Sequence, residues 1–228
     1  MQKIFESFVK YSREQLHSGK GYWNDDIRLC GITNLVKRIL KQKFNFNINS
    51  IWTPKMHRWH NVRKFCERDR KELIECLEKN SIVLKNKIKK HFTEKYGWSG
   101  LIMRALSEHN FYNANVEVLV DYKRYCTGID ILALHNDKLC CIEMKALGVL
   151  KRDGEYENRI LNNARSIYAH FQAALTTTLL FLNLKQKHLN IEVPEAYILW
   201  LYVDDYQFER VASTFINDLV QKSDKIFV

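Results

Sequence analysis

The sequence is poor in the features that mark membrane-spanning, secreted and disordered proteins. It contains two prolines and eight glycines among 228 residues, 46% of which are apolar, and this composition favours an ordered globular protein. Its longest apolar run, Ala196 to Val203, is too short to cross a bilayer. The first residues contain no apolar segment of the kind found in secretory signals. We therefore expect an intracellular protein, in the cytoplasm, the nucleus or an organelle, with no membrane partner.

Cysteine occurs six times, but no CxxC pair is present, so the pattern typical of zinc and iron–sulfur motifs is missing. Cys140 and Cys141 are adjacent within an apolar run that reads as a strand, and they would face opposite sides of it. We expect buried thiols in a reducing compartment rather than disulfides or metal ligands. The six are Cys30, Cys66, Cys76, Cys126, Cys140 and Cys141.

Positive charge is concentrated in the first two-fifths of the chain. Residues 1–95 carry 22 basic and 10 acidic side chains, a surplus of +12, whereas residues 96–228 carry 14 and 16, a balance of −2. A positive field of this size attracts polyanions, and nucleic acid is the usual one. The alternative is that the lysines only solvate helices. We expect two regions: a basic, mainly helical region at 1–95 that grips nucleic acid, and a core at 96–228.

The basic region combines helical patterns with an aromatic cluster. Apolar residues recur at three-to-four spacing over 1–45 and again over 61–90, which predicts helices. The segment between them is broken by Pro54 and ends in interleaved basic and aromatic residues, including Arg58 and Trp59. Such a pair can bind phosphate and stack on bases. Aromatic residues that close a small helical subdomain are the alternative.

The order of elements in the core predicts an α/β (α+β) fold, with a mixed central sheet flanked by helices. The long helix is expected to bury a stripe that includes Ile167 and Phe171. The expected elements are a helix over Gly100–His109, a strand over Val116–Val120, a hairpin over Gly128–Lys145, a helix over Tyr156–Leu182, a strand over Glu195–Val203 and a helix over Phe208–Gln221.

The hairpin contains three charges that an apolar strand would not normally hold. Glu143 and Lys145 are two residues apart, so they point to the same face, and Asp130 lies on the partner strand. Two buried carboxylates are costly unless a charged group such as a metal ion joins them. We therefore expect a divalent-metal site. In the alternative, Glu143 and Lys145 form an exposed salt-bridged edge and Asp130 begins a turn.

Asp130, followed thirteen residues later by Glu143-Met144-Lys145 after an apolar run, resembles the motif of the PD-(D/E)XK nuclease superfamily. The resemblance covers roughly residues 95–220. Ile129 stands where the motif nominally has proline, a departure that the superfamily commonly tolerates. The helix that carries Gln172 resembles the additional glutamine motif of the lambda-exonuclease type and related repair nucleases.

The resemblance implies a restriction-endonuclease-like core and a Mg²⁺ or Mn²⁺ ion. Asp130, Glu143 and the Met144 carbonyl would hold the ion, Lys145 would act on the attacking water or the developing charge, and Gln172 would orient this end of the site. An upstream glutamate would complete the catalytic and metal-binding set. Glu108 matches it best, and Glu117 is the competitor.

The implied substrate is single- or double-stranded DNA, cut to leave 5′-phosphate ends in replication, recombination or repair. Arg165, two helical turns before the glutamine, would hold a phosphate, and Lys123 and Arg124 lead into the hairpin as further contacts. An RNA endonuclease on the same fold and a non-catalytic nucleic-acid-binding module are the alternatives. A sequence-specific restriction enzyme is a further one, although no separate recognition domain is evident.

Overall fold

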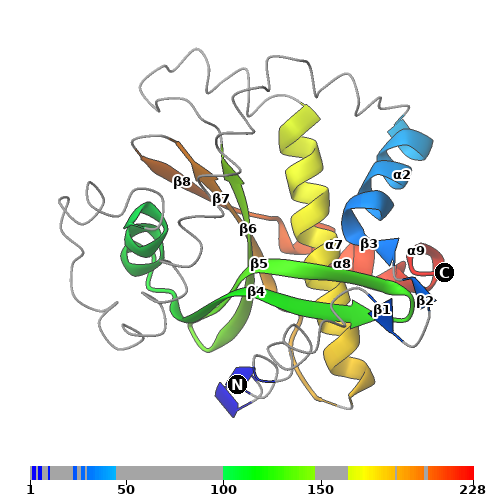
Figure 1. Ribbon diagram of the computed structural model, residues 1–228, viewed down its shortest axis with the longest axis horizontal. Coiled ribbons are helices and arrows are strands. Elements are labelled where there is room, and N and C mark those ends of the chain that lie inside the picture. Colours follow the sequence, from blue (N-terminus) through cyan, green and yellow to red (C-terminus); the bar gives the residue numbers. More distant parts are fainter. Residues whose placement is uncertain are drawn as a thin grey trace.

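The chain folds around a mixed, curled central sheet with helices on both faces, which confirms the expected α+β class (Figure 1). The computed structural model describes residues 2–3, 5–6, 10, 23–24, 27–28, 30–44, 100–146, 164–187, 189–202 and 205–228. The expected helical pattern over 61–90 and the Pro54 segment lie outside these residues.

The described strands form one two-stranded and one six-stranded sheet. The small sheet pairs β1 (Trp23–Asn24) with β2 (Ile27–Arg28). The large sheet contains β3 (Cys30–Gly31), β4 (Tyr112–Tyr122), β5 (Tyr125–His135), β6 (Lys138–Ala146), β7 (Glu195–Leu201) and β8 (Tyr206–Arg210). The helices are α2 (Ile32–Phe44), residues 100–108, α7 (Ala164–Gln186), α8 (Ser213–Gln221) and α9 (Ser223–Ile226).

The hairpin expected over Gly128–Lys145 is formed by β5 and β6, and it closes at a polar tip. His135 pairs with Lys138, and the two residues between them, Asn136 and Asp137, have φ values of 48° and 59°. Two consecutive left-handed residues are what a tight two-residue hairpin turn requires, and Asn and Asp tolerate them best after glycine. The tip thus sets the register in which Ile131 pairs with Ile142.

The large sheet is mixed, because β3 runs parallel to β5 and β7 runs parallel to β6. Strands β4, β5 and β6 pair antiparallel, whereas β7 runs parallel to β6 and β8 returns antiparallel to β7. A parallel neighbour needs a crossover connection, and α7 lies in the chain between β6 and β7. The helix packs back against β4, β6 and β7 and so covers the face of the hairpin on which the candidate charges lie.

Each face of the sheet has its own apolar core because successive strand residues point in opposite directions. One face packs under α7 and α2 and includes Cys141, Ile198 and Trp200. The other packs under residues 100–108 and includes Ile142 and Leu199. Figure 1 shows α7 and the green helix of residues 100–108 on opposite sides of β6 and β7.

The expected closing helix over Phe208–Gln221 is wrong in its first part. Residues Tyr206–Arg210 form the edge strand β8, and the helix begins only at Ser213. Phe208 is paired with Leu199 of β7 and lies against the core beneath residues 100–108. A local pattern of apolar residues cannot distinguish these states, because the ladder partner lies outside the segment.

Helical residues do not fill the whole of 1–45, because β3 pairs in parallel with the start of β5. Helix α2 follows β3, and its buried residues Leu35 and Val36 belong to the core beneath α7. Part of the basic region therefore contributes to the same core as the hairpin.

The buried stripe of α7 differs at one position from the expected one. Phe171 is partly buried against the core and packs on Phe215 of α8, but Ile167 is 45% exposed. No helix in the part of the chain that the structure describes is long and apolar enough to cross a membrane.

Ile198→Ala is expected to lower the free energy of unfolding by about 2–5 kcal/mol, because it opens a cavity where Ile198 is fully buried between β7 and α7. The same change at the exposed Ile167 is expected to alter it by less than about 0.5 kcal/mol. Urea unfolding of the two variants measures both values, and equal losses would contradict the assignment of the α7 face.

Candidate metal centre on the central hairpin

The hairpin register places Asp130 and Glu143 side by side. Asp130 precedes Ile131 in β5, Glu143 follows Ile142 in β6, and Ile131 and Ile142 are paired. The Glu143 side chain is 5% exposed. The alternative in which Glu143 lies on an exposed, salt-bridged edge is therefore wrong, because this side chain is buried.

The Asp130 carboxylate is anchored to the strand that carries Glu143. Its Oδ2 atom accepts a hydrogen bond of 2.8 Å from the backbone N–H of Met144. This bond ties β5 to β6 just beyond their last paired residues. It also brings the Met144 backbone close to the Asp130 carboxylate.

Lys145 connects the hairpin to α7. Its Nζ atom donates to Glu143 Oε1 at 2.5 Å and to Gln172 Oε1 at 3.0 Å, and it lies 5.9 Å from the centre of the Tyr168 ring. Residues 168 and 172 are four apart and so lie on one side of the helix. The structure thus brings together Asp130, Glu143, Lys145 and Gln172 as the sequence predicts.

Burial and mutual repulsion shape the charges of this group. Burial, and then the neighbouring Glu143 carboxylate, raise the pKa of Asp130 to about 7 against the opposing effects of Lys145 and the Met144 amide. Burial alone would lower the pKa of Lys145, but the Glu143 and Asp130 carboxylates outweigh it and the pKa is raised. Lys145 therefore stays protonated, and its single positive charge does not fully neutralise the two carboxylates.

These residues suit a small divalent cation better than a soft metal. Asp130 and Glu143 offer carboxylate oxygens, and the Met144 carbonyl adds a neutral oxygen from the same strand. Oxygen ligands of this kind are the ones preferred by Mg²⁺ and Mn²⁺. Burial and the neighbouring Glu143 carboxylate both raise the pKa of Asp130, and a bound cation would oppose both effects.

Glu108 is held elsewhere by its own partners. It ends the helical residues 100–108, which pack against the sheet face opposite to α7. Its carboxylate accepts a hydrogen bond from the Tyr206 hydroxyl and lies 3.6 Å from Arg104 Nε, and its side chain is 55% exposed. Arg104 also pairs with Asp205.

Glu117, the competing upstream carboxylate, lies on β4. Its neighbours Val116 and Val118 pair with Ile131 and Ile129 of β5. The backbone of Glu117 therefore lies beside that of Asp130, one strand away.

The expected nucleic-acid contacts are placed only in part. Lys123 and Arg124 form the turn between β4 and β5, about 20 Å along the strand from Asp130 at about 3.3 Å per residue. Lys123 Nζ donates to the Phe227 carbonyl at 3.1 Å. Arg165 lies in the first turn of α7, but its side chain is outside the described residues, as are Arg58 and Trp59.

A further carboxylate on the α7 face was missed by sequence analysis. Glu209 of β8 is paired with Ile198, which is paired in turn with Glu143. Its two oxygens contact His170 Nε2 at 3.0 Å and Trp200 Nε1 at 2.9 Å. Sequence analysis placed Glu209 in the expected helix over Phe208–Gln221. Its position in strand β8, paired with Ile198, is what brings it to this face.

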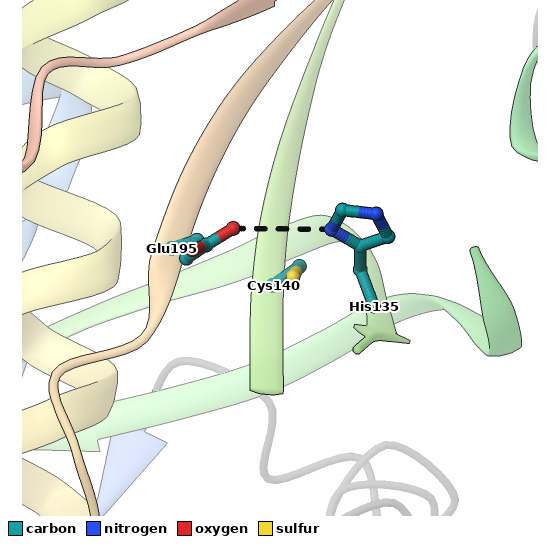
Figure 2. Close-up of side chains that lie close together, drawn as sticks. All are labelled: His135, Cys140 and Glu195. Atoms are coloured by element: carbon teal, nitrogen blue, oxygen red, sulfur yellow. Dashed lines mark ion pairs between the residues drawn. The ribbon is translucent and has the colours of Figure 1, made fainter. Parts of the chain in front are cut away.

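A second group was missed on the other face, near the tip of the hairpin. His135, Cys140 and Glu195 offer ligand atoms that all lie within 4.8 Å of one another, and together they could hold a metal ion (Figure 2). They span sixty residues and match no spacing motif, so no local pattern in the sequence marks them. The expectation of buried, unbridged thiols is confirmed for Cys140, and likewise for Cys141 and Cys126.

Comparisons with known proteins assign no family. No protein-family model matches the sequence, and no curated protein matches it. A solved structure described as "Crystal structure of SSO0001" aligns over 98% of this chain and 86% of that one, with 13% identity and a TM-score of 0.36. A likeness of this size supports no conclusion about fold or function.

The metal-free protein is expected to lose stability as pH rises from about 5 to about 8. The folded-state pKa of Asp130, about 7, exceeds its unfolded value, so the folded state keeps a proton that the unfolded state releases. Urea unfolding in EDTA across this range measures the loss. Asp130→Asn should flatten the dependence, and an unchanged slope in that variant would contradict the assigned pKa.

Proposed function

We propose that this protein is a metal-dependent DNA nuclease that hydrolyses phosphodiester bonds and leaves 5′-phosphate ends. The observation that carries the proposal is the hydrogen-bonded, partly buried group of Asp130, Glu143 and Lys145 with Gln172, at the end of one hairpin and under one helix. This is the residue set that the PD-(D/E)XK resemblance requires. Its place in replication, recombination or repair is part of the same proposal.

Asp130, Glu143 and the Met144 carbonyl are the proposed ligands of Mg²⁺ or Mn²⁺. When bound, such an ion lowers the pKa of a coordinated water and offsets charge on the phosphoryl oxygens. Asp130 is fixed by the Met144 amide and Glu143 by the Lys145 ammonium. Neither carboxylate needs to reorganise far to act as a ligand, which is the condition for effective electrostatic catalysis.

Lys145 is proposed to act mainly through its positive charge. Its raised pKa keeps the amine protonated, so it can donate to the attacking water or to an oxygen on which negative charge develops. Gln172 holds the amine by its side-chain oxygen at 3.0 Å. This makes Gln172 a positioning residue for Lys145.

The finer fold and partner assignments belong to the same proposal. We take residues 96–228 as a restriction-endonuclease-like core and the basic surplus of 1–95 as the grip on an intracellular DNA substrate. Arg165, Lys123, Arg124, Arg58 and Trp59 are the proposed contacts to it. Because β3 and α2 join the sheet and the core beneath α7, the basic region is anchored to the core.

Lys145→Ala and Asp130→Ala are each expected to reduce DNA cleavage by at least about 100-fold, within the range typical of a lost catalytic group. The measurement is digestion of end-labelled linear DNA and of circular DNA with Mg²⁺ or Mn²⁺, which also separates exonuclease from endonuclease action. Lys185→Ala, at an exposed lysine in the last turn of α7, is the matched control and should cut normally.

Four outcomes would contradict this proposal. Cleavage retained by Lys145→Ala would contradict the site assignment. Cleavage in EDTA would contradict the proposed metal dependence. RNA cut in preference to DNA in parallel assays would favour an RNA endonuclease. Binding of DNA without any cleavage would favour a non-catalytic module.

Glu108→Gln is expected to reduce cleavage less than Asp130→Asn does. Its carboxylate already accepts a hydrogen bond from Tyr206, and its helix packs on the opposite face of the sheet. Initial rates for Glu108→Gln and Glu117→Gln, measured side by side, decide which one is the upstream carboxylate. A loss at Glu108 equal to that at Asp130 would place Glu108 in the site.

A further inference from the structure

Three neighbouring strands each carry a metal-ligand side chain near the tip of the hairpin. His135 is the last residue of β5, Cys140 lies on β6, and Glu195 is the first residue of β7. Cys140 pairs with Ala133 on one side and Glu195 on the other, and His135 is two residues from Ala133. Paired residues, and residues two apart in a strand, share a face of the sheet. Figure 2 shows the three side chains gathered there.

We propose that His135, Cys140 and Glu195 form a zinc site, separate from the site at Asp130 and Glu143. Their ligand atoms lie within 4.8 Å of one another. A tetrahedral zinc ion, with bonds of about 2.0–2.3 Å, holds its ligand atoms about 3.5 Å apart. Closing this difference requires the ligand atoms to approach one another by about 1 Å.

The chemistry of the donors favours zinc over the ions expected at the other site. An imidazole nitrogen, a thiolate sulfur and a carboxylate oxygen are the three zinc ligand types, whereas Mg²⁺ avoids sulfur. On binding, the Cys140 thiol gives its proton to solvent as the sulfur–zinc bond forms. The three side chains fill three positions, which leaves the fourth to water.

The surroundings already orient the carboxylate. The Tyr197 hydroxyl donates to Glu195 Oε2 at 2.6 Å, and Arg210 Nη2 donates to Glu195 Oε1 at 2.6 Å. Hydrogen bonds of this kind to a ligating carboxylate are a regular feature of protein metal sites. The His135 ring packs against Phe111 at 4.9 Å between centroids, which restricts its rotation.

The two sites are separated by the sheet itself. Cys140 and Glu143 are three apart in β6, so they lie on opposite faces, and Cys140 belongs to the core beneath residues 100–108. Zinc at the tip would join β5, β6 and β7 without touching the hydrogen bonds of Lys145. Its expected effect is therefore to stabilise the end of the sheet.

The test uses the full chain, stripped with EDTA and titrated with Zn²⁺ and with Co²⁺. Zn²⁺ should bind at one equivalent by elemental analysis and raise the melting temperature by several degrees, because it binds the folded state preferentially. Co²⁺ should give a near-ultraviolet thiolate charge-transfer band. The oxygen ligands proposed at Asp130 and Glu143 cannot give such a band, so Asp130→Asn should retain it.

Cys140→Ser should abolish the band and weaken Zn²⁺ binding by at least about 100-fold, more than is typical for loss of an outer-shell partner. Cys141→Ser is the matched control, because Cys141 is the next residue, equally buried but facing α7. It should keep both signals. If Cys140→Ser fails to fold, His135→Gln and Glu195→Gln test the site instead. Both should weaken Zn²⁺ binding.

Absence of the band in the unmodified protein, or a band that persists in Cys140→Ser, would overturn the zinc site. Neither result bears on cleavage at Asp130 and Glu143.

Discussion

The ammonium of Lys145 is the group on which the arrangement of the α7 face depends. Two carboxylates buried side by side repel one another, and here a single cation from the same strand opposes them. That cation is held in turn by Gln172, so the position of α7 and the charge balance of the hairpin are linked. A helix docked elsewhere would leave the amine with one fewer partner in a buried place, at a cost of about 1–3 kcal/mol.

Strand β6 contributes side chains to both faces of the sheet, because successive residues of a strand point in opposite directions. Glu143 and Lys145 point toward α7, while Cys140, three residues before Glu143, points toward the helical residues 100–108. One short apolar strand therefore carries the candidate catalytic carboxylate and a proposed zinc ligand. The two positions are isolated from one another because a close-packed sheet lies between them.

The hairpin could be predicted because its signals are local. Alternation places Glu143 and Lys145 together, and the polar residues Asn136 and Asp137 mark the turn that sets the register. The edge strand β8 could not be predicted in this way, because Tyr206–Arg210 is a strand only through its pairing with β7. Ile167 of α7 shows the same limit of local patterns. Periodicity predicts an apolar stripe along the helix, but packing against other elements decides which residues of the stripe are buried.

The α+β class, the hairpin and the shared face of Glu143 and Lys145 with Asp130 follow from the sequence, because short-range spacing decides which side chains share a face. Gln172 was expected only from the resemblance, and its contact with Lys145 depends on how α7 packs on the hairpin. Tertiary packing was also needed to place Glu108 against Tyr206 on the other side of the sheet, Glu209 on the α7 face, and His135 and Cys140 beside Glu195. Those contacts depend on how strands β6, β7 and β8 are aligned. Alignment between distant strands is set by the packing of the whole core, which no local pattern encodes.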